Sequence, residues 1–213
     1  PMARIRALPP QYTKRFHPED YFKPLKWENV FAVKHPIEIE LGAGDGSFLI
    51  AYASKHPEIN LLGIERLLGR IRKIDRDTHR AGVGNIQLFR IEAGYFLKYL
   101  APNRSIRAVH VYFPDPWPKI RHHKKRLINE DFVNKCAGIL EPGGMVHLRT
   151  DHPHYFDQML DVFGRNECFE KSIPSESLIA IKTDFENHFN DQGIQTQYAS
   201  YQLQEQSNIA QTN

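Results

Sequence analysis

From residue 37 to residue 163, short apolar segments alternate with longer segments of helical periodicity. Strands are expected at residues 37–41, 59–64, 86–91, 106–113 and 145–150, and helices at residues 47–56, 66–81, 94–100, 129–140 and 154–163. Such alternation is typical of βαβ units, which build a mostly parallel sheet with helices on both faces. A last strand is expected at residues 197–204, after a polar insertion at about residues 173–195. The 213 residues suit one domain with a full core.

A glycine-rich turn directly follows the first of these strands. Gly42, Gly44 and Gly46 alternate with other residues before the first helix. Glycines at such a turn let the backbone approach a ligand closely at a helix N-terminus. A dinucleotide-binding fingerprint would need glycine at position 47, where the chain has Ser47, so NAD and FAD are disfavoured.

Three carboxylates are expected at the same edge of the sheet. Glu40 precedes the glycine turn, Glu65 ends the second strand and Glu92 follows the third. The carboxyl ends of parallel strands form the edge where such folds bind ligands. A carboxylate there suits a ribose diol or an adenine amino group. Because no phosphate-binding lysine accompanies the three carboxylates, they favour a cationic nucleoside ligand such as S-adenosylmethionine. Alternatively, they are solvated residues at the ends of strands and bind no ligand.

The stretch at residues 111–126 joins the end of a strand to a basic run. Pro114, Pro116 and Pro118 alternate with Asp115, Trp117 and Lys119. Five of the eight residues at positions 119–126 are Lys or Arg, whereas the net charge of the whole chain is only +3. Any nucleic-acid surface must therefore be a local patch. We expect a reaction site beside a polyanion, with a solvated helix start as the alternative; Trp117 either stacks on a base or is a buried core residue.

The remaining features narrow the class of protein. Residues 2–35 are irregular and basic, through Arg4, Arg6, Lys14 and Arg15, and form either a partly ordered tail or an arm that contacts phosphates. Cys136 and Cys168 lack zinc spacing, so we expect reduced thiols and no metal site. No apolar run approaches a membrane span.

Several motifs, in order over residues 37–190, resemble those of the bacterial single-subunit tRNA (guanine-N7-)-methyltransferase family. They are the segments at residues 40–46 (ELGAGDG), 63–65 (GIE), 113–126 (FPDPWPKIRHHKKR), 149–151 (RTD) and 183–186 (TDFE). The proline–aspartate–tryptophan segment is highly specific, whereas the glycine turn is not. The family often has Asp where this chain has Glu92 and Arg where it has Lys125, and a lysine lacks the bidentate fork of arginine.

The resemblance implies a class I S-adenosylmethionine-dependent methyltransferase, with a Rossmann-like, mostly parallel seven-stranded sheet whose last strand is antiparallel. A methyltransferase domain at residues 36–205 would follow a basic arm at residues 1–35 and precede a polar tail at residues 206–213. The implied substrate is a guanosine in the tRNA variable loop, in a cytoplasmic enzyme without metal, membrane or obligatory protein partner, either monomer or homodimer.

The resemblance also implies the role of individual residues. The cofactor would be bound by Glu40, Gly42, Gly44, Glu65, Glu92 and Asp115. The substrate would be contacted by Lys119, Asp151, Thr183, Asp184, Phe185 and Glu186. The RNA would be contacted by Arg121, His122, His123, Lys124, Lys125 and Arg126.

Asp115 is the predicted catalytic residue. Guanine N7 carries a lone pair and no proton, so no base is needed at the attacking atom. We expect Asp115, with Asp151 or Glu186, to hold the guanine edge and offset the charge that grows on the ring. The alternatives are a binding module that has lost catalysis, a nucleotide-dependent oxidoreductase, and a methyltransferase acting on another atom or RNA. Without the resemblance, residues 183–186 are better interpreted as the cap of a helix.

Overall fold

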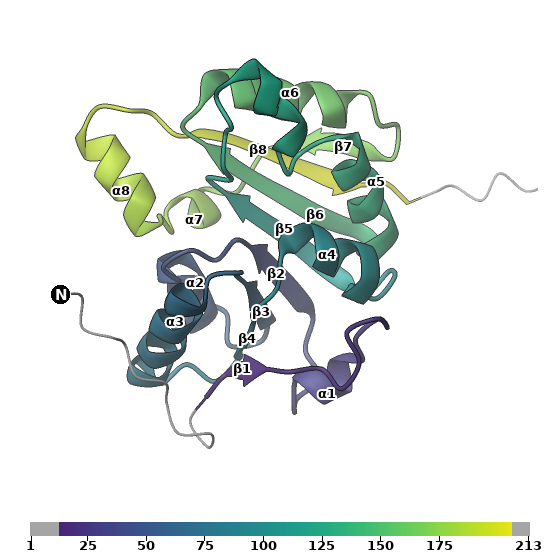
Figure 1. Cartoon of the computed structure of the whole chain (residues 1–213), viewed down its shortest axis with the longest axis vertical. Helices are drawn as coiled ribbons and strands as arrows, with labels where there is room; N and C mark the ends of the chain where they lie inside the picture. Colours follow the sequence, from purple (N-terminus) through teal and green to yellow (C-terminus); the bar gives the residue numbers. More distant parts are fainter. Residues whose placement is uncertain (1–12, 206–213) are drawn as a thin grey trace, which may run out of the picture.

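The structure is a computed structural model and describes residues 13–205. One eight-stranded sheet crosses the molecule in the order β1-β4-β3-β2-β5-β6-β8-β7 (Figure 1). Its strands are β1 (Arg15–Phe16), β2 (Ile37–Leu41), β3 (Asn60–Ile64), β4 (Ile86–Phe89), β5 (Ile106–Tyr112), β6 (Leu140–Thr150), β7 (Phe169–Ser172) and β8 (Gln197–Leu203). Strand β8 alone runs antiparallel to its neighbours, so the predicted mostly parallel sheet is confirmed.

Helices cover both faces of the sheet, as expected from the alternation. One face packs against α1 (Trp27–Val30), α4 (Ala93–Tyr95), the π-helix η2 (Phe96–Leu100), α5 (Glu130–Ile139) and α6 (Pro153–Gly164). The other packs against α2 (Ser47–Lys55), α3 (Leu68–Ala81) and α7 (Glu176–Ile179). The 3-10 helix η3 (Ile120–Lys125) and α8 (Asp184–Asp191) complete the set, and α8 lies beside α7 at one side of the molecule (Figure 1).

The sheet has one strand more than the seven expected. The additional strand is β1, two residues of the basic arm that pair in parallel with β4. Two residues carry no hydrophobic periodicity, so the sequence gives no signal for this strand. The buried Asp75 of α3 holds the segment, accepting from the Thr13 hydroxyl at 2.6 Å and the Lys14 amide at 2.7 Å. Arg4 and Arg6, the other basic residues of the arm, lie outside the described residues.

Two further segments differ from the expectation. Strand β6 begins at Leu140, five residues before the strand expected at residues 145–150. In this added part the register to β5 shifts, and Gly143 has a φ of +76°. The insertion predicted at residues 173–195 contains α7 and α8. Both helices are short, and α8 buries only Glu186, so neither has the long apolar stripe that predicts a helix.

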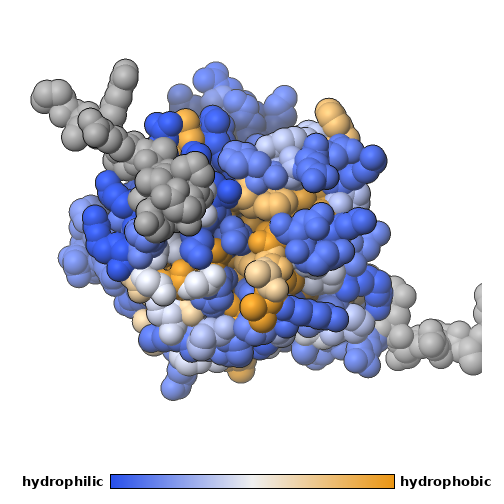
Figure 2. Space-filling view, turned by 90° about the horizontal axis from the view of Figure 1, so that it is seen from below, coloured by the Kyte–Doolittle hydropathy of each residue, from blue (hydrophilic) through white to orange (hydrophobic). Residues whose placement is uncertain are grey.

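Figure 2 shows one face on which hydrophilic residues surround a central hydrophobic band. Within residues 13–205, no helix has the length and apolar character needed to cross a membrane.

Candidate functional site

A cavity of about 550 Å³ opens where the sheet changes winding direction, at the carboxyl ends of β2, β3, β4 and β5. Ligands of open α/β sheets bind at this kind of switch point. Five residues predicted for binding or catalysis line the cavity, namely Gly42, Glu65, Glu92, Asp115 and Lys125. The structure therefore brings together residues that lie up to 83 positions apart in the sequence.

The glycine turn shapes the wall of the cavity. Gly42 has a φ of +77°, and a Cβ there would meet no atom within 4 Å, so its backbone is open to a ligand. Gly46 caps α2 with a φ of +81°, and a Cβ there would lie 2.7 Å from the Ile74 side chain. The first glycine leaves room for a ligand, and the second lets α2 pack closely on α3.

Two of the carboxylates are fixed by backbone amides. Glu65 is 5% exposed and accepts hydrogen bonds from the amides of Gly44 at 3.2 Å and Leu67 at 2.9 Å. Glu92 caps α4 and accepts from the amides of Gly94 at 2.9 Å and Tyr95 at 2.8 Å. A carboxylate can accept about four hydrogen bonds, so each retains acceptor capacity toward the cavity.

Glu40 is buried beside the turn with one oxygen unpaired. It is 3% exposed, and Oε2 has no hydrogen-bond partner within the described part of the chain. Burial raises the pKa of the Glu40 carboxyl well above its usual range, the charges of Asp45 and Glu65 raise it further, and the nearby Arg149 opposes the shift. An unpaired buried acceptor costs free energy unless a ligand supplies a donor. This oxygen therefore fits a ligand that carries a cationic or hydrogen-bonding group.

The loop after β5 presents Asp115 at the mouth of the cavity. Asp115 is exposed, and its Oδ1 accepts from the Trp117 amide at 3.0 Å. Phe113 and Trp117 flank it with φ values of +52° and +43°, in a region that bulky residues seldom adopt. The Phe113 amide donates to Arg149 O at 2.9 Å, so the loop starts from a fixed point on the sheet.

The basic run forms η3 and is mostly at the surface. Lys119, Arg121, Lys124 and Lys125 are exposed, and His122 and His123 are half-buried. Arg126 differs from the expected surface position, because it is only 1% exposed. Its guanidinium donates to Pro116 O at 2.7 Å and to Gln158 Oε1 at 2.7 Å. Arg126 thus anchors the Asp115 loop through the carbonyl of Pro116. To contact a phosphate, its guanidinium would have to break these hydrogen bonds.

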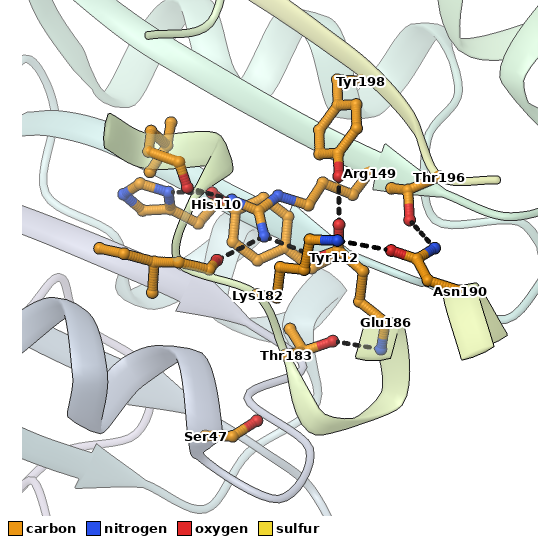
Figure 3. Close-up of polar contacts among 12 residues, drawn as sticks. Ser47, His110, Tyr112, Arg149, Lys182, Thr183, Glu186, Asn190, Thr196 and Tyr198 are labelled. Carbon is orange, nitrogen blue, oxygen red and sulfur yellow. Dashed lines mark hydrogen bonds and ion pairs between the residues drawn. The ribbon is translucent and has the colours of Figure 1, made fainter. Parts of the chain in front are cut away.

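A buried arginine that the sequence did not single out ties the insertion to the sheet. Arg149 of β6 is 1% exposed and donates to Leu178 O and Ile181 O at the end of α7, both at 2.7 Å. It also pairs with Glu186 of α8 at 2.9 Å, and the Tyr198 hydroxyl donates to the same carboxylate (Figure 3). Its guanidinium lies 4.2 Å from the Tyr112 ring centroid. The RTD motif contained this residue, but no pattern in the sequence marks it as buried.

The segment at residues 183–186, predicted to contact the substrate, has two buried and two exposed residues. Thr183 and Glu186 are buried, and the Thr183 hydroxyl accepts from the Glu186 amide at 2.8 Å, as the helix-cap interpretation predicts. Asp184 and Phe185 are exposed; the Asp184 amide donates to Ser47 Oγ at 2.9 Å, and the Phe185 ring lies 5.0 Å from that of Phe113. Only the second pair is exposed and so accessible to a substrate.

Two other residues were predicted to contact the substrate. Lys119 is exposed, and Asp151 is half-buried just after β6. Among residues 13–205, no three or more His, Cys, Asp or Glu side chains are grouped so that they could hold a metal ion. Both cysteines are free.

The sequence matches known proteins over most of its length. The family described as "Putative methyltransferase" matches residues 34–199. A tRNA (guanine-N(7)-)-methyltransferase of Thermotoga maritima is 33% identical over 89% of this chain and 58% of the relative. A protein of the same name from Enterococcus faecalis is 34% identical over 79% of this chain and 80% of the relative. The chain spans between half and two thirds of the length of several such relatives.

Solved structures share the fold at low sequence identity. The 16S rRNA methyltransferase KamB superimposes with a TM-score of 0.62 at 12% identity, over 84% of this chain and 93% of that one. An A1408 methyltransferase of the 30S ribosome from an uncultured bacterium gives a TM-score of 0.55 at 13% identity, over 84% and 92%. The fold is therefore that of class I S-adenosylmethionine-dependent methyltransferases, as the resemblance implied.

Proposed function

The chain belongs to the tRNA (guanine-N(7)-)-methyltransferase family, and we propose that it transfers a methyl group from S-adenosylmethionine to N7 of a guanosine in the variable loop of tRNA. One observation carries the proposal: Glu65, Glu92 and Asp115 line a single cavity beside Gly42, with the unpaired Glu40 two residues before that glycine. The choice of guanine N7 in tRNA as the methylated atom rests on the names of the relatives, and the cofactor site rests on the cavity.

The donor set of the cavity fits the cofactor. S-adenosylmethionine, when bound, supplies an electrophilic methyl group on a sulfonium. Glu65 has a fixed carboxylate for a ribose diol, and Glu92 has one for an adenine amino group. Glu40 offers an unpaired acceptor to an ammonium group. The three acids that line the cavity, Glu65, Glu92 and Asp115, also favour a ligand of positive charge.

The protein's own contribution to the reaction is positioning and electrostatics. Guanine N7 attacks through its lone pair, so no side chain has to remove a proton there. Asp115 stands on a loop held by three contacts, through Phe113, Trp117 and Arg126. In this proposal Asp115 would accept from the N1–H and amino group of the guanine and offset the charge that the purine gains. Asp184 and Phe185, the second with its ring 5.0 Å from that of Phe113, would close over the base.

The exposed basic side chains of η3 would bind the tRNA backbone. Arg121, Lys124 and Lys125 of η3, and Lys119 just before it, are exposed, and Lys125 lines the same cavity as Asp115. Phosphate contacts of this kind fix register and orientation and carry no sequence information. We assign the chain to the cytoplasm, acting as a monomer or homodimer without an obligatory protein partner.

The test is incubation with S-adenosylmethionine and bulk tRNA, followed by nucleoside mass spectrometry. The wild type should form 7-methylguanosine, and Asp115→Asn should reduce kcat about a hundredfold, or about 3 kcal/mol. An Asp115→Asn rate within threefold of wild type would remove the role of this residue. Cofactor binding by calorimetry without any methylation would indicate the alternative, a binding module.

A further inference from the structure

The Trp117 ring stands at the wall of the cavity and not in the core. The indole is half-buried and lines the cavity together with Asp115. Its backbone has a φ of +43°, a left-handed conformation that is an outlier for a bulky residue and is found mainly where function requires it. The Trp117 amide also donates to the Asp115 carboxylate at 3.0 Å, which ties the carboxylate to the backbone that carries the ring.

A cation lies on the face of this ring. Lys125 Nζ is 4.6 Å from the Trp117 ring centroid, and the His122 ring stands perpendicular to the indole at 5.7 Å. Lys125 lines the same cavity and is otherwise exposed. Indole is the aromatic ring that attracts cations most strongly through its face. The structure thus shows that this face accepts a positive charge at the mouth of the cavity.

A guanine methylated at N7 is a flat, aromatic cation. When the N7 lone pair forms the bond to the methyl carbon, the bond from that carbon to sulfur breaks and its electron pair stays on sulfur. No proton moves, so the purine gains one positive charge. A ring face that holds the Lys125 ammonium in the free protein offers the same electrostatic attraction to the purine, plus the area for stacking.

We propose that the face of Trp117 receives the guanine ring in place of the Lys125 ammonium and stabilises the positive charge that the purine acquires on methylation. This inference rests on the proposed function. Trp117 would then contribute more to the transition state than to the binding of neutral guanine, and therefore more to kcat than to KM. A cation–aromatic interaction at a partly desolvated site corresponds to about three- to thirtyfold in rate.

The chain has only two tryptophans, which makes the test direct. Trp27 lines a different cavity and donates to Ser105 Oγ, and Trp27→Phe leaves Trp117 as the only tryptophan. In that variant, under excitation selective for tryptophan, 7-methylguanosine monophosphate should quench the fluorescence and bind more tightly than guanosine monophosphate. In Trp117→Phe, where Trp27 is the only tryptophan, neither nucleotide should quench the tryptophan emission. Equal quenching by the two nucleotides, or quenching that persists in Trp117→Phe, would overturn the proposal.

Kinetics separate stacking from a purely structural role. Trp117→Leu keeps an apolar side chain without a ring face and should lower kcat three- to thirtyfold, with less than a twofold change in the KM for tRNA. Trp117→Phe keeps a ring and should lie between Leu and wild type. Equal rates for the Phe and Leu variants would overturn the proposal. If the wild type forms 7-methylguanosine and the ring variants match it, this inference alone fails; if the wild type forms none, the proposed function fails as well.

Discussion

Removal of the Arg149 side chain should loosen the α7–α8 segment from the sheet. Arg149→Met keeps the bulk of the stem but leaves Glu186, which is 0% exposed, without its cation at 2.9 Å. It also leaves Leu178 O and Ile181 O without their donors at 2.7 Å. Breaking a buried ion pair on one side costs about 3–5 kcal/mol, and an unpaired buried acceptor costs about 1–3 kcal/mol. Because the α7–α8 segment can partly undock, we expect a total loss of about 4–6 kcal/mol.

A double-mutant cycle isolates the ion pair from the carbonyl contacts. Glu186→Gln keeps the shape of the side chain and should cost about 1.5–3 kcal/mol. The double variant Arg149→Met/Glu186→Gln should be less destabilised than the sum of the single variants by about 2 kcal/mol. Urea unfolding followed by circular dichroism gives the three free energies, and hydrogen exchange of residues 176–191 reports local undocking. Additivity within about 0.5 kcal/mol would refute the coupling of Arg149 to Glu186.

Three further predictions concern acid stability, the glycine turn and tRNA binding. Burial lowers the pKa of His147 from 6.5 to about 3. The folded protein therefore gains its full stability from the neutral imidazole above pH 6.5, and below that pH the free energy of unfolding falls by up to about 1.4 kcal/mol per pH unit. In urea titrations between about pH 7 and pH 5, His147→Gln should make the free energy of unfolding less dependent on pH. Gly46→Ala should destabilise the fold by about 2–4 kcal/mol, because its Cβ would overlap Ile74 and its backbone is left-handed. Gly42 is also left-handed but has no atom within 4 Å of an added Cβ, so Gly42→Ala should cost only about 1–2 kcal/mol. Equal losses for the two variants would contradict the packing role of Gly46. The logarithm of the tRNA affinity should fall linearly with the logarithm of the salt concentration, and Arg121→Ala should reduce this slope by about 0.7–0.9. The exposed Lys171 on β7 serves as a control, because Lys171→Ala should leave the slope unchanged, whereas Arg126→Ala removes a buried side chain and should lower stability. An unchanged slope for Arg121→Ala would show that Arg121 does not contact the RNA.

The fold was predictable where the sequence has strong periodicity. Strands β2 and β3 consist entirely of buried residues, and each is bounded by turn residues, so their place in a parallel sheet could be inferred. The carboxylates at the ends of these strands then had to meet at one edge. Short elements were not predictable: β1 has two residues, and in β7 only Phe169 is buried. Such segments are ordered by contacts with distant residues, as Asp75 orders Thr13 and Lys14.

The site was predictable as a set of residue types but not as a set of orientations. Arg121 and Arg126 look alike in the basic run, yet one is exposed and the other is buried against Pro116 and Gln158. Glu186 likewise turns inward to Arg149, whereas its neighbour Phe185 faces outward. These differences depend on which side chain meets a partner from another part of the chain, and a single sequence does not encode that in its local pattern.

The most direct test of the central claim follows the methyl group itself. The protein is incubated with tRNA and S-adenosylmethionine labelled in the methyl carbon, and the RNA is digested for nucleoside analysis and cleaved chemically at 7-methylguanosine. The label should appear in 7-methylguanosine alone, with cleavage at one position in the variable loop. Label in another nucleoside, or cofactor that binds without transfer of label to tRNA, would contradict the proposed function.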